Sequence, residues 1–344
     1  MRSGLTLAVA CHVEYPPMSN PLVTVIIPVW NSAAFIEETV KSVLGQTFRA
    51  YELIIVNDGS PDTVELEAAL LPYRHSLKYL PERHKGAAAA RNVALHVATG
   101  TYVAFLDADD SWLPTYLDLQ IAFLTAHPDV DLVYADGAIT GNSPLAGRTF
   151  METAPSRGAV TLKSLLSLRC NVLTSGVVVR RSVVVEAGMF DETIPRGHDF
   201  DLWIRLARRG ARLAYQRRVL LKRRIHSSNL SGDSIAECER ALDALHRIER
   251  SMPLAPDEHA AVSASLTWLN SRRERELGKR CLRTGDFAGA IDAIHRAYRA
   301  EPSLKLRAIA LGLRLVPSWL YRIDRARQIR ATRPAQRLGR TAVV

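Results

Sequence analysis

Between residues 22 and 110 the sequence alternates short apolar runs with amphipathic segments, and this alternation constrains the fold more than any other feature. The apolar runs are rich in β-branched residues and stay apolar at successive positions, as strands buried on both faces must. They cover residues 23–27, 53–56 and 102–106. Because helical segments separate these runs, the pattern predicts an α/β fold with a mostly parallel sheet flanked by helices.

Each of these three predicted strands is followed at once by polar residues. The polar clusters cover residues 28–31, 57–60 and 107–110. In open α/β sheets, ligands bind outside the carboxyl ends of the strands. We therefore expect the three clusters to line one crevice and to form the functional site.

The remainder of the chain divides into further sheet elements and a helical part. Residues 113–136 and 175–209 carry strand and helix patterns, whereas residues 140–158, rich in Gly and Pro, predict a long loop or an excursion at the edge of the sheet. After residue 234 the sequence becomes helical and rich in Ala, Leu, Arg and Glu. We therefore predict an N-terminal extension (1–20), a sheet-bearing domain (21–232), a helical C-terminal region (233–321) and a basic, disordered tail (322–344).

The net charge of +10 favours a polyanionic partner, which includes nucleic acid, an anionic membrane and a phosphate-bearing substrate. From residue 322 onward seven arginines face one acid, but the only aromatic residues beside them are Trp319 and Tyr321. Nucleic-acid binding, which uses interleaved aromatic residues, is therefore disfavoured. The four cysteines are far apart and form no CxxC pair, which favours a reduced, cytoplasmic location.

The segment 304–321 is apolar but is interrupted by Arg307, Arg314 and Pro317. It is too short and too charged to span a bilayer. One interpretation is a helix that lies on the inner face of an anionic membrane, which would place the protein there as a peripheral protein. The other is an ordinary packed helix followed by a solvated tail.

The run Asp107-Ala108-Asp109 places two carboxylates one residue apart at a strand end. Such oxygen ligands suit Mn2+ or Mg2+ bridging a diphosphate, although a helix N-cap is the alternative reading of an isolated pair. Asp58 follows another strand, where its carboxylate either accepts from a nucleotide or forms an Asx-turn. Arg91 lies near the start of a helix with small side chains, which predicts a fixed cation close to a ligand.

Four sequence blocks together resemble the family 2 glycosyltransferases in order and spacing. They cover residues 25–31, 56–60, 90–92 and 105–110, and the resemblance extends over about residues 21–231. It implies a GT-A fold for the sheet-bearing domain. It also implies these donor-site roles: Pro28, Val29 and Asn31 lining the nucleotide pocket, Asp58 reading the base, Asp107 contacting the ribose and Asp109 binding the metal.

Two further positions match this family. Asp199 corresponds to the general base, with Asp201 as an alternative, and His198 stands where the family usually has Glu. His226 matches a position that supplies a metal or diphosphate contact in some related enzymes. The neighbouring cations at 222–224 are an alternative source of the diphosphate contact.

These features predict an inverting glycosyltransferase that uses Mn2+ or Mg2+. Its donor would be a nucleoside-diphosphate sugar and its acceptor a hydroxyl of a saccharide or a lipid-linked saccharide, in surface polysaccharide or glycolipid synthesis. The alternative is a non-catalytic protein that binds a nucleotide sugar or a polyanion. The presence of Asp107, Asp109 and Asp199 argues against that alternative.

Overall fold

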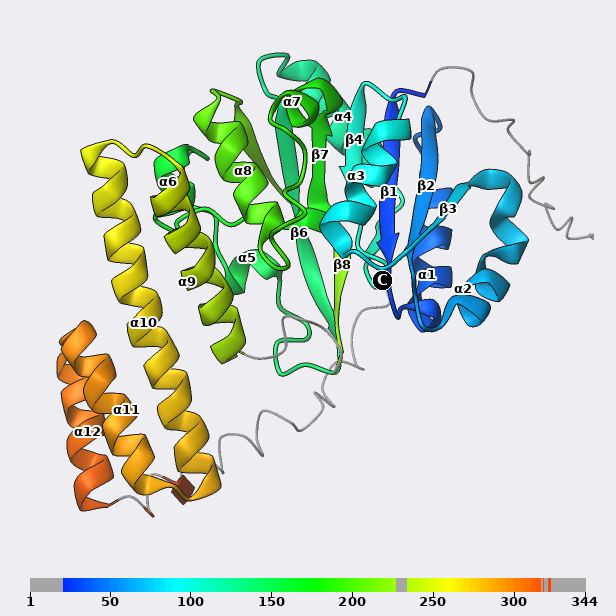
Figure 1. The fold of residues 1–344 in the computed structure, drawn as a ribbon. Coiled ribbons are helices and arrows are strands. Elements are labelled where there is room, and N and C mark those ends of the chain that lie inside the picture. The colour runs from blue at the N-terminus through cyan, green and yellow to red at the C-terminus, as the bar shows by residue number, and fades with distance from the viewer. Residues whose placement is uncertain (1–20, 227–233, 317, 319–320, 323–344) are drawn as a thin grey trace, which may run out of the picture.

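The computed structural model describes residues 21–226, 234–316, 318 and 321–322. The predicted extension (1–20) and nearly all of the predicted tail lie outside these residues, and so do Trp319 and residues 227–233. The described chain contains one eight-stranded sheet in the order β3-β2-β1-β4-β7-β6-β8-β5, with helices on both faces (Figure 1).

The first half of the sheet is parallel, as the alternating apolar runs predict. It contains β1 (Val23–Val29), β2 (Tyr51–Asp58), β3 (Lys78–Glu82) and β4 (Tyr102–Phe105), joined through α1 (Ala33–Leu44), α2 (Thr63–Leu70), the 3-10 helix η1 (Leu71–Ser76) and α3 (Ala87–Val97). The three predicted strands are confirmed. Strand β3 was not predicted, because this edge strand is polar, largely exposed and contains a proline.

The second half of the sheet is mixed. It contains β5 (Ser111–Trp112), β6 (Leu132–Gly141), β7 (Val177–Arg180) and β8 (Leu213–Ile225). Strand β7 runs antiparallel to β4 and β6, and β5 runs antiparallel to β8, so parallel pairing covers four neighbouring pairs and antiparallel pairing three. The helices of this half are α4 (Tyr116–Ala126), α5 (Phe150–Thr153), α6 (Leu162–Leu166), η2 (Thr174–Gly176), α7 (Arg181–Glu186) and α8 (His198–Arg208).

The segment 140–158 is more ordered than the predicted loop. Strand β6 continues to Gly141, and α5 forms inside the segment with a capping box between Thr149 and Glu152. The prediction relied on Gly and Pro content, which does not register a short helix fixed by two reciprocal cap hydrogen bonds.

Two hydrophobic layers cover the two faces of the sheet. One face packs Ile26 and Ile54 against α3 and α8, and the other packs Val25 and Ile55 against α1, α2 and α4 (Figure 1). Successive strand residues therefore point to opposite layers, both of them apolar. This double burial holds the carboxyl ends of the strands in a rigid frame.

The C-terminal part consists of α9 (Ser234–Ser251), α10 (Pro256–Thr284), α11 (Phe287–Ala300) and α12 (Leu304–Leu315). Leu245 of α9 and Val262 of α10 belong to the same core layer as α3 and α8. In contrast, α11 and α12 form a separate small core with Leu306 and Leu313, beside the far end of α10 (Figure 1). The predicted boundary at 232/233 stays a prediction. No helix of the described residues has the length and apolarity needed to cross a membrane.

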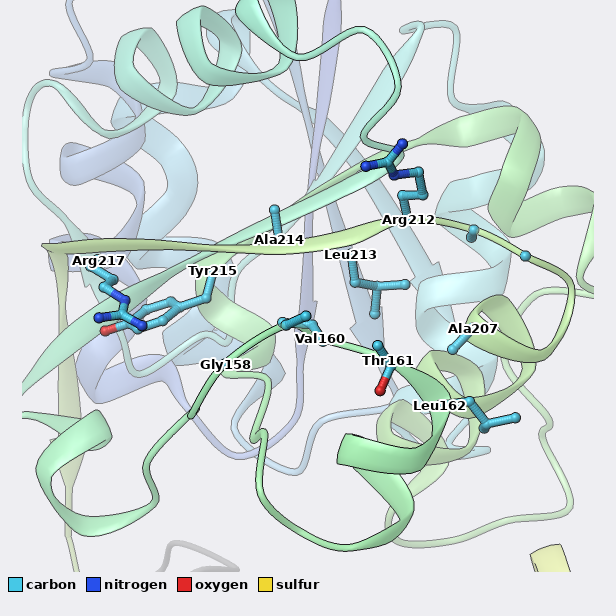
Figure 2. A pocket seen from close by; sticks show the side chains of 13 residues that line it. Gly158, Val160, Thr161, Leu162, Ala207, Arg212, Leu213, Ala214, Tyr215 and Arg217 are labelled. Carbon is cyan, nitrogen blue, oxygen red and sulfur yellow. The ribbon is translucent and has the colours of Figure 1, made fainter. Parts of the chain in front are cut away.

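A cavity of about 560 Å³ lies between residues 158–162 and the start of β8 (Figure 2). Leu213 and Tyr215 of β8 point toward it, whereas Arg212 points away. Strand β6 runs in the direction of β4, and its first residue pairs with Leu213. The cavity therefore lies at the opposite end of the sheet from the three predicted polar clusters.

Candidate active site

The three polar clusters meet at one edge of the sheet, as predicted. Strand β1 pairs with β2 on one side and with β4 on the other, in parallel register. The Asn31 amide donates to Ser60 Oγ over 2.6 Å, which links the first two clusters. The Thr39 hydroxyl donates to the Ala108 carbonyl over 2.9 Å, which links α1 to the third.

Asp58 lies buried at the end of β2 and holds the loop that opens α3. Its carboxylate accepts from the backbone amides of Lys85 (2.8 Å) and Gly86 (2.9 Å), and His84 Nδ1 lies 2.9 Å from it. Gly59 has φ +60°, and a Cβ there would lie 2.6 Å from the His84 amide nitrogen. Glycine therefore permits the close approach of the two loops. A cavity of about 230 Å³ adjoins Asp58.

Trp30 and His84 form an aromatic platform beside Asp58 that the sequence analysis missed. Their rings stack with centroids 5.1 Å apart, and Trp30 is 50% exposed. Val29 is fully buried, its backbone included, so it has no surface for a ligand in this structure, while Asn31 adopts a left-handed φ of 51°. The sequence did contain a signal for this platform: Trp30 directly follows a buried strand, and an exposed aromatic side chain at such a place indicates a binding surface.

Arg91 is a buried cation of the site, and its guanidinium contacts both Asp107 and His198. Its NH2 donates to Asp107 Oδ1 over 2.6 Å, and its NH1 lies 2.8 Å from His198 Nε2. The guanidinium also lies 5.5 Å from the Phe190 ring centroid. Asn92 fixes Phe190 through both of that residue's backbone groups. The structure thus brings together Arg91 and Asp107, two of the predicted site residues, and adds His198.

Asp199 lies in the first turn of α8. Thr174 Oγ1 donates to its Oδ2 over 2.7 Å, and the Phe200 amide donates to its Oδ1 over 2.8 Å. Burial alone would raise the pKa of Asp199, but His198, the Thr174 hydroxyl and Arg91 outweigh it and hold that pKa below the ordinary value. The alternative acid, Asp201, is instead paired with Arg205 at 2.7 Å.

Asp109 and His226 lie in contact on the other side of the cluster. His226 Nε2 is 3.0 Å from Asp109 Oδ2, and the His226 ring stacks on Phe35. Burial and the neighbouring Asp107 charge raise the pKa of Asp109, while His226 opposes the shift. Asp110 is more deeply buried, and burial with the adjacent carboxylates raises its pKa well above the ordinary value. Asp107, Asp109 and Asp110 thus bring three carboxylates together on one turn.

Arg224 is engaged inside this cluster. Its side chain pairs with Glu38 and donates from Nε to the Asp109 carbonyl over 3.2 Å. Its backbone amide donates to Asp110 Oδ1 over 2.9 Å. Of the cations at 222–224, Arg224 thus supports the Asp109 turn.

Asp109 and His226 are the residues that would hold a divalent cation. Across the residues that the structure describes, no three His, Cys, Asp or Glu side chains are arranged as a closed metal site. One carboxylate and one imidazole nonetheless fit Mn2+, which takes oxygen and nitrogen ligands. Burial and the Asp107 charge raise the pKa of Asp109, so a bound cation would favour its ionised form. An open two-residue site of this kind leaves room for a substrate's oxygen atoms.

The profile model for glycosyl transferase family 2 matches residues 24–183. Among curated relatives, the UDP-Glc:alpha-D-GlcNAc-diphosphoundecaprenol beta-1,3-glucosyltransferase WfaP of Escherichia coli is 30% identical over 229 residues, which cover 66% of this chain and 86% of WfaP. An uncharacterized glycosyltransferase of Rickettsia bellii is 32% identical over 214 residues, but they cover 60% of this chain and only 30% of that longer protein.

The solved structure of the mannosyltransferase PcManGT from Pyrobaculum calidifontis, in complex with GDP-Man and Mn2+, superposes with a TM-score of 0.62. The match covers 93% of this chain and 87% of that one at 22% identity. This likeness confirms the GT-A type fold. The profile match and the 30% identity to WfaP, 86% of which the alignment covers, establish that this chain belongs to glycosyl transferase family 2.

Proposed function

We propose that this protein transfers a sugar from a nucleoside diphosphate to a hydroxyl of a lipid-linked saccharide, with inversion at the anomeric carbon. The observation that carries the proposal is the state of Asp199. This carboxylate has a depressed pKa, accepts from Thr174, and is tied through His198 and Arg91 to the Asp107 turn. An ionised carboxylate at the strand-end edge is what a general base requires.

In the proposed reaction, Asp199 takes the proton of the acceptor hydroxyl. The hydroxyl oxygen then forms a bond to the anomeric carbon while the bond from that carbon to the diphosphate breaks on the opposite face. A divalent cation held by Asp109 and His226 would neutralise the charge of the departing diphosphate. Because the base and the leaving group lie on opposite faces, the configuration inverts.

The donor would lie across the ends of β1, β2 and β4. We assign the nucleobase to the Trp30–His84 platform beside Asp58, next to Asn31 and to Pro28, with buried Val29 supporting the strand end. Asp107 would accept from a ribose hydroxyl, since Arg91 fixes its carboxylate. WfaP is named for transfer from UDP-Glc to a diphosphoundecaprenol-linked GlcNAc, which supports a UDP-sugar and a polyprenol-linked acceptor for this chain.

The test is transfer from radiolabelled UDP-glucose to undecaprenyl-diphosphate-GlcNAc in the presence of Mn2+, with GDP-mannose and UDP-GlcNAc as alternative donors. We expect Asp199→Asn to lower kcat about 10³-fold, within the usual contribution of a general base. Nucleotide binding, followed by thermal shift with UDP and Mn2+, should persist. The matched control is Asp201→Asn on the same helix turn, which should stay within about threefold of wild type. Asp199→Asn with more than a tenth of wild-type activity would exclude this base.

A membrane contact through α12 belongs to the same proposal, because a polyprenol-linked acceptor lies in a membrane. One face of α12 packs inward through Leu306, Ala310 and Leu313, yet Leu311 and Leu315 on another face are 58% and 70% exposed. The flanking charges on α12 are all positive: Lys305, Arg307 and Arg314. An apolar stripe flanked by cations suits an anionic lipid surface.

Flotation with vesicles of phosphatidylglycerol and phosphatidylcholine tests this contact. We expect Leu311→Glu with Leu315→Glu to reduce the bound fraction of the full chain about tenfold, because both apolar anchors are lost. The control, Leu71→Glu, changes an equally exposed leucine on η1 and should leave binding unchanged. Equal flotation of the double variant and the wild type would exclude α12 as the contact.

A further inference from the structure

The contact between Arg91 and His198 joins two parts of the site that are 107 positions apart in the sequence. Arg91 lies on α3 and is only 5% exposed, whereas His198 is the first residue of α8, directly before Asp199. The distance from Arg91 NH1 to His198 Nε2 is 2.8 Å. The same guanidinium donates to Asp107. One buried cation therefore bridges the turn after β4 and the start of α8.

The chemistry of this contact fixes the protonation state of His198. A guanidinium carries only donors and keeps its charge at every physiological pH. His198 Nε2 must therefore accept, so the ring is neutral and carries its proton on Nδ1. A protonated imidazole would present an N–H toward Arg91, and the hydrogen bond would be lost.

The groups around His198 are consistent with a neutral ring. The Phe190 ring packs edge-on at 5.7 Å, and the charged neighbours are Arg91 from α3, Asp107 from the turn after β4 and Asp199 from α8. Burial lowers the pKa of His198 most, and Arg91 lowers it further. Asp199, Asp107 and the Ile194 carbonyl act in the opposite direction without reversing the shift.

We propose that His198 is a positioning residue for the transfer reaction: as a neutral acceptor it holds Arg91 against Asp107 and keeps both in register with Asp199. This inference rests on the proposed function of Asp199 and Asp107. A histidine at position 198 makes the reaction sensitive to pH in a way that a carboxylate there would not. Protonation of His198 sets two cations against each other in a buried site, so Arg91 leaves its position and catalysis stops on the acid side.

Three variants separate the acceptor role from a merely structural one. His198→Gln places an amide oxygen where Nε2 lies but does not titrate, so kcat at neutral pH should stay within about threefold of wild type. His198→Ala removes the acceptor from a buried cation, and kcat should fall at least about tenfold, with a smaller change in KM for the donor. His75→Gln, an exposed histidine on η1, is the matched control.

The pH profile of kcat carries the decisive comparison. In wild type, kcat should fall about tenfold per pH unit below the pKa of His198, which lies under the ordinary histidine value. In His198→Gln this limb should disappear, because a glutamine side chain does not titrate. The control variant should keep the wild-type limb. An unchanged limb in His198→Gln would overturn the proposal.

A spectroscopic measurement decides the same point without any transfer assay. The chain has ten histidines, so the ¹⁵N-histidine spectrum of the full-length protein can be assigned by the signals that vanish in His198→Gln. We expect the His198 signals to show a protonated Nδ1 and an unprotonated Nε2 at neutral pH. A proton on Nε2 would refute the proposal. Because this readout needs no substrate, it stays valid even if the proposed transfer reaction fails.

Discussion

Asp107 and Asp109 lie two residues apart on the same turn, yet basic side chains of different kinds face them. Asp107 pairs with Arg91 at 2.6 Å, and Asp109 contacts His226 at 3.0 Å. A guanidinium has only donors and cannot bind a cation, whereas a histidine ring is a good metal ligand. The turn thus has one carboxylate held by a permanent cation and one whose partner can also bind a metal.

This difference fits two separate tasks. A carboxylate that must accept from a donor sugar's nucleoside needs a fixed position, which the buried Arg91 provides. A carboxylate that must receive a cation needs a partner able to join it as a ligand, and His226 meets that need. Substitutions on the Arg91–Asp107 side and on the Asp109–His226 side should therefore have different effects, and we take them from the largest expected effect to the smallest.

The largest effect is expected on the Arg91 side. Arg91→Met should lower the free energy of unfolding by about 3 kcal/mol, because it removes the charge-assisted hydrogen bond to Asp107 and leaves His198 Nε2 without its donor. Urea unfolding at neutral pH measures this loss. The control, Arg74→Met, changes an exposed arginine that stacks on Tyr79, and should cost less than about 1 kcal/mol. A loss below about 1 kcal/mol in Arg91→Met would show that the pair does not anchor the site.

On the other side, His226→Gln should weaken Mn2+ binding at least about tenfold, as loss of a ligand-sphere residue usually does. The metal-free free energy of unfolding should change by less than about 1 kcal/mol, since the glutamine amide can still donate a hydrogen bond to Asp109. Isothermal titration with Mn2+ in the presence of UDP gives the affinity. His246→Gln removes a histidine from another carboxylate contact, the exposed His246–Glu249 pair, and serves as the control. Equal affinity in wild type and His226→Gln would remove His226 from the metal site.

The carboxylates of this comparison could be located from the sequence. Apolar runs of β-branched residues identified β1, β2 and β4, and parallel strands in register bring their carboxyl ends together. Asp58, Asp107 and Asp109 were therefore predicted at one edge, where the structure has them. Local sequence pattern alone predicts such strands, because a strand that is buried on both faces is apolar at successive positions.

Other features depended on contacts that no local pattern encodes. Strand β8 carries five cations in thirteen residues and has only the two-residue β5 on its outer side, so periodicity did not identify it. The stacking of Trp30 on His84 and the bridge from Arg91 to His198 join distant segments. Similarly, α9 follows a change in composition, yet its leucines complete the core of the sheet face.

The smallest effect, but the sharpest comparison, is the metal-free stability of Asp107→Asn and Asp109→Asn. Asp107→Asn should lower the free energy of unfolding by about 1–2 kcal/mol, because it removes the charge that faces buried Arg91. Asp109→Asn should leave the free energy of unfolding unchanged or raise it by up to about 1 kcal/mol, because the buried charge beside Asp107 costs stability. Of two chemically identical changes, two residues apart, one is thus expected to destabilise the protein and the other is not.

The sign for Asp109 follows from linkage. The folded state raises the pKa of Asp109, so the folded state binds this proton more tightly than the unfolded state. The penalty is absent below the ordinary carboxyl pKa, grows as pH rises from that value to the raised one, and is complete above the raised value. Thermal unfolding of wild type and Asp109→Asn should therefore converge in acid and diverge at neutral pH. Mn2+ with UDP should then stabilise wild type but not Asp109→Asn, whereas a neutral-pH loss of stability in metal-free Asp109→Asn would contradict the contrast with Asp107.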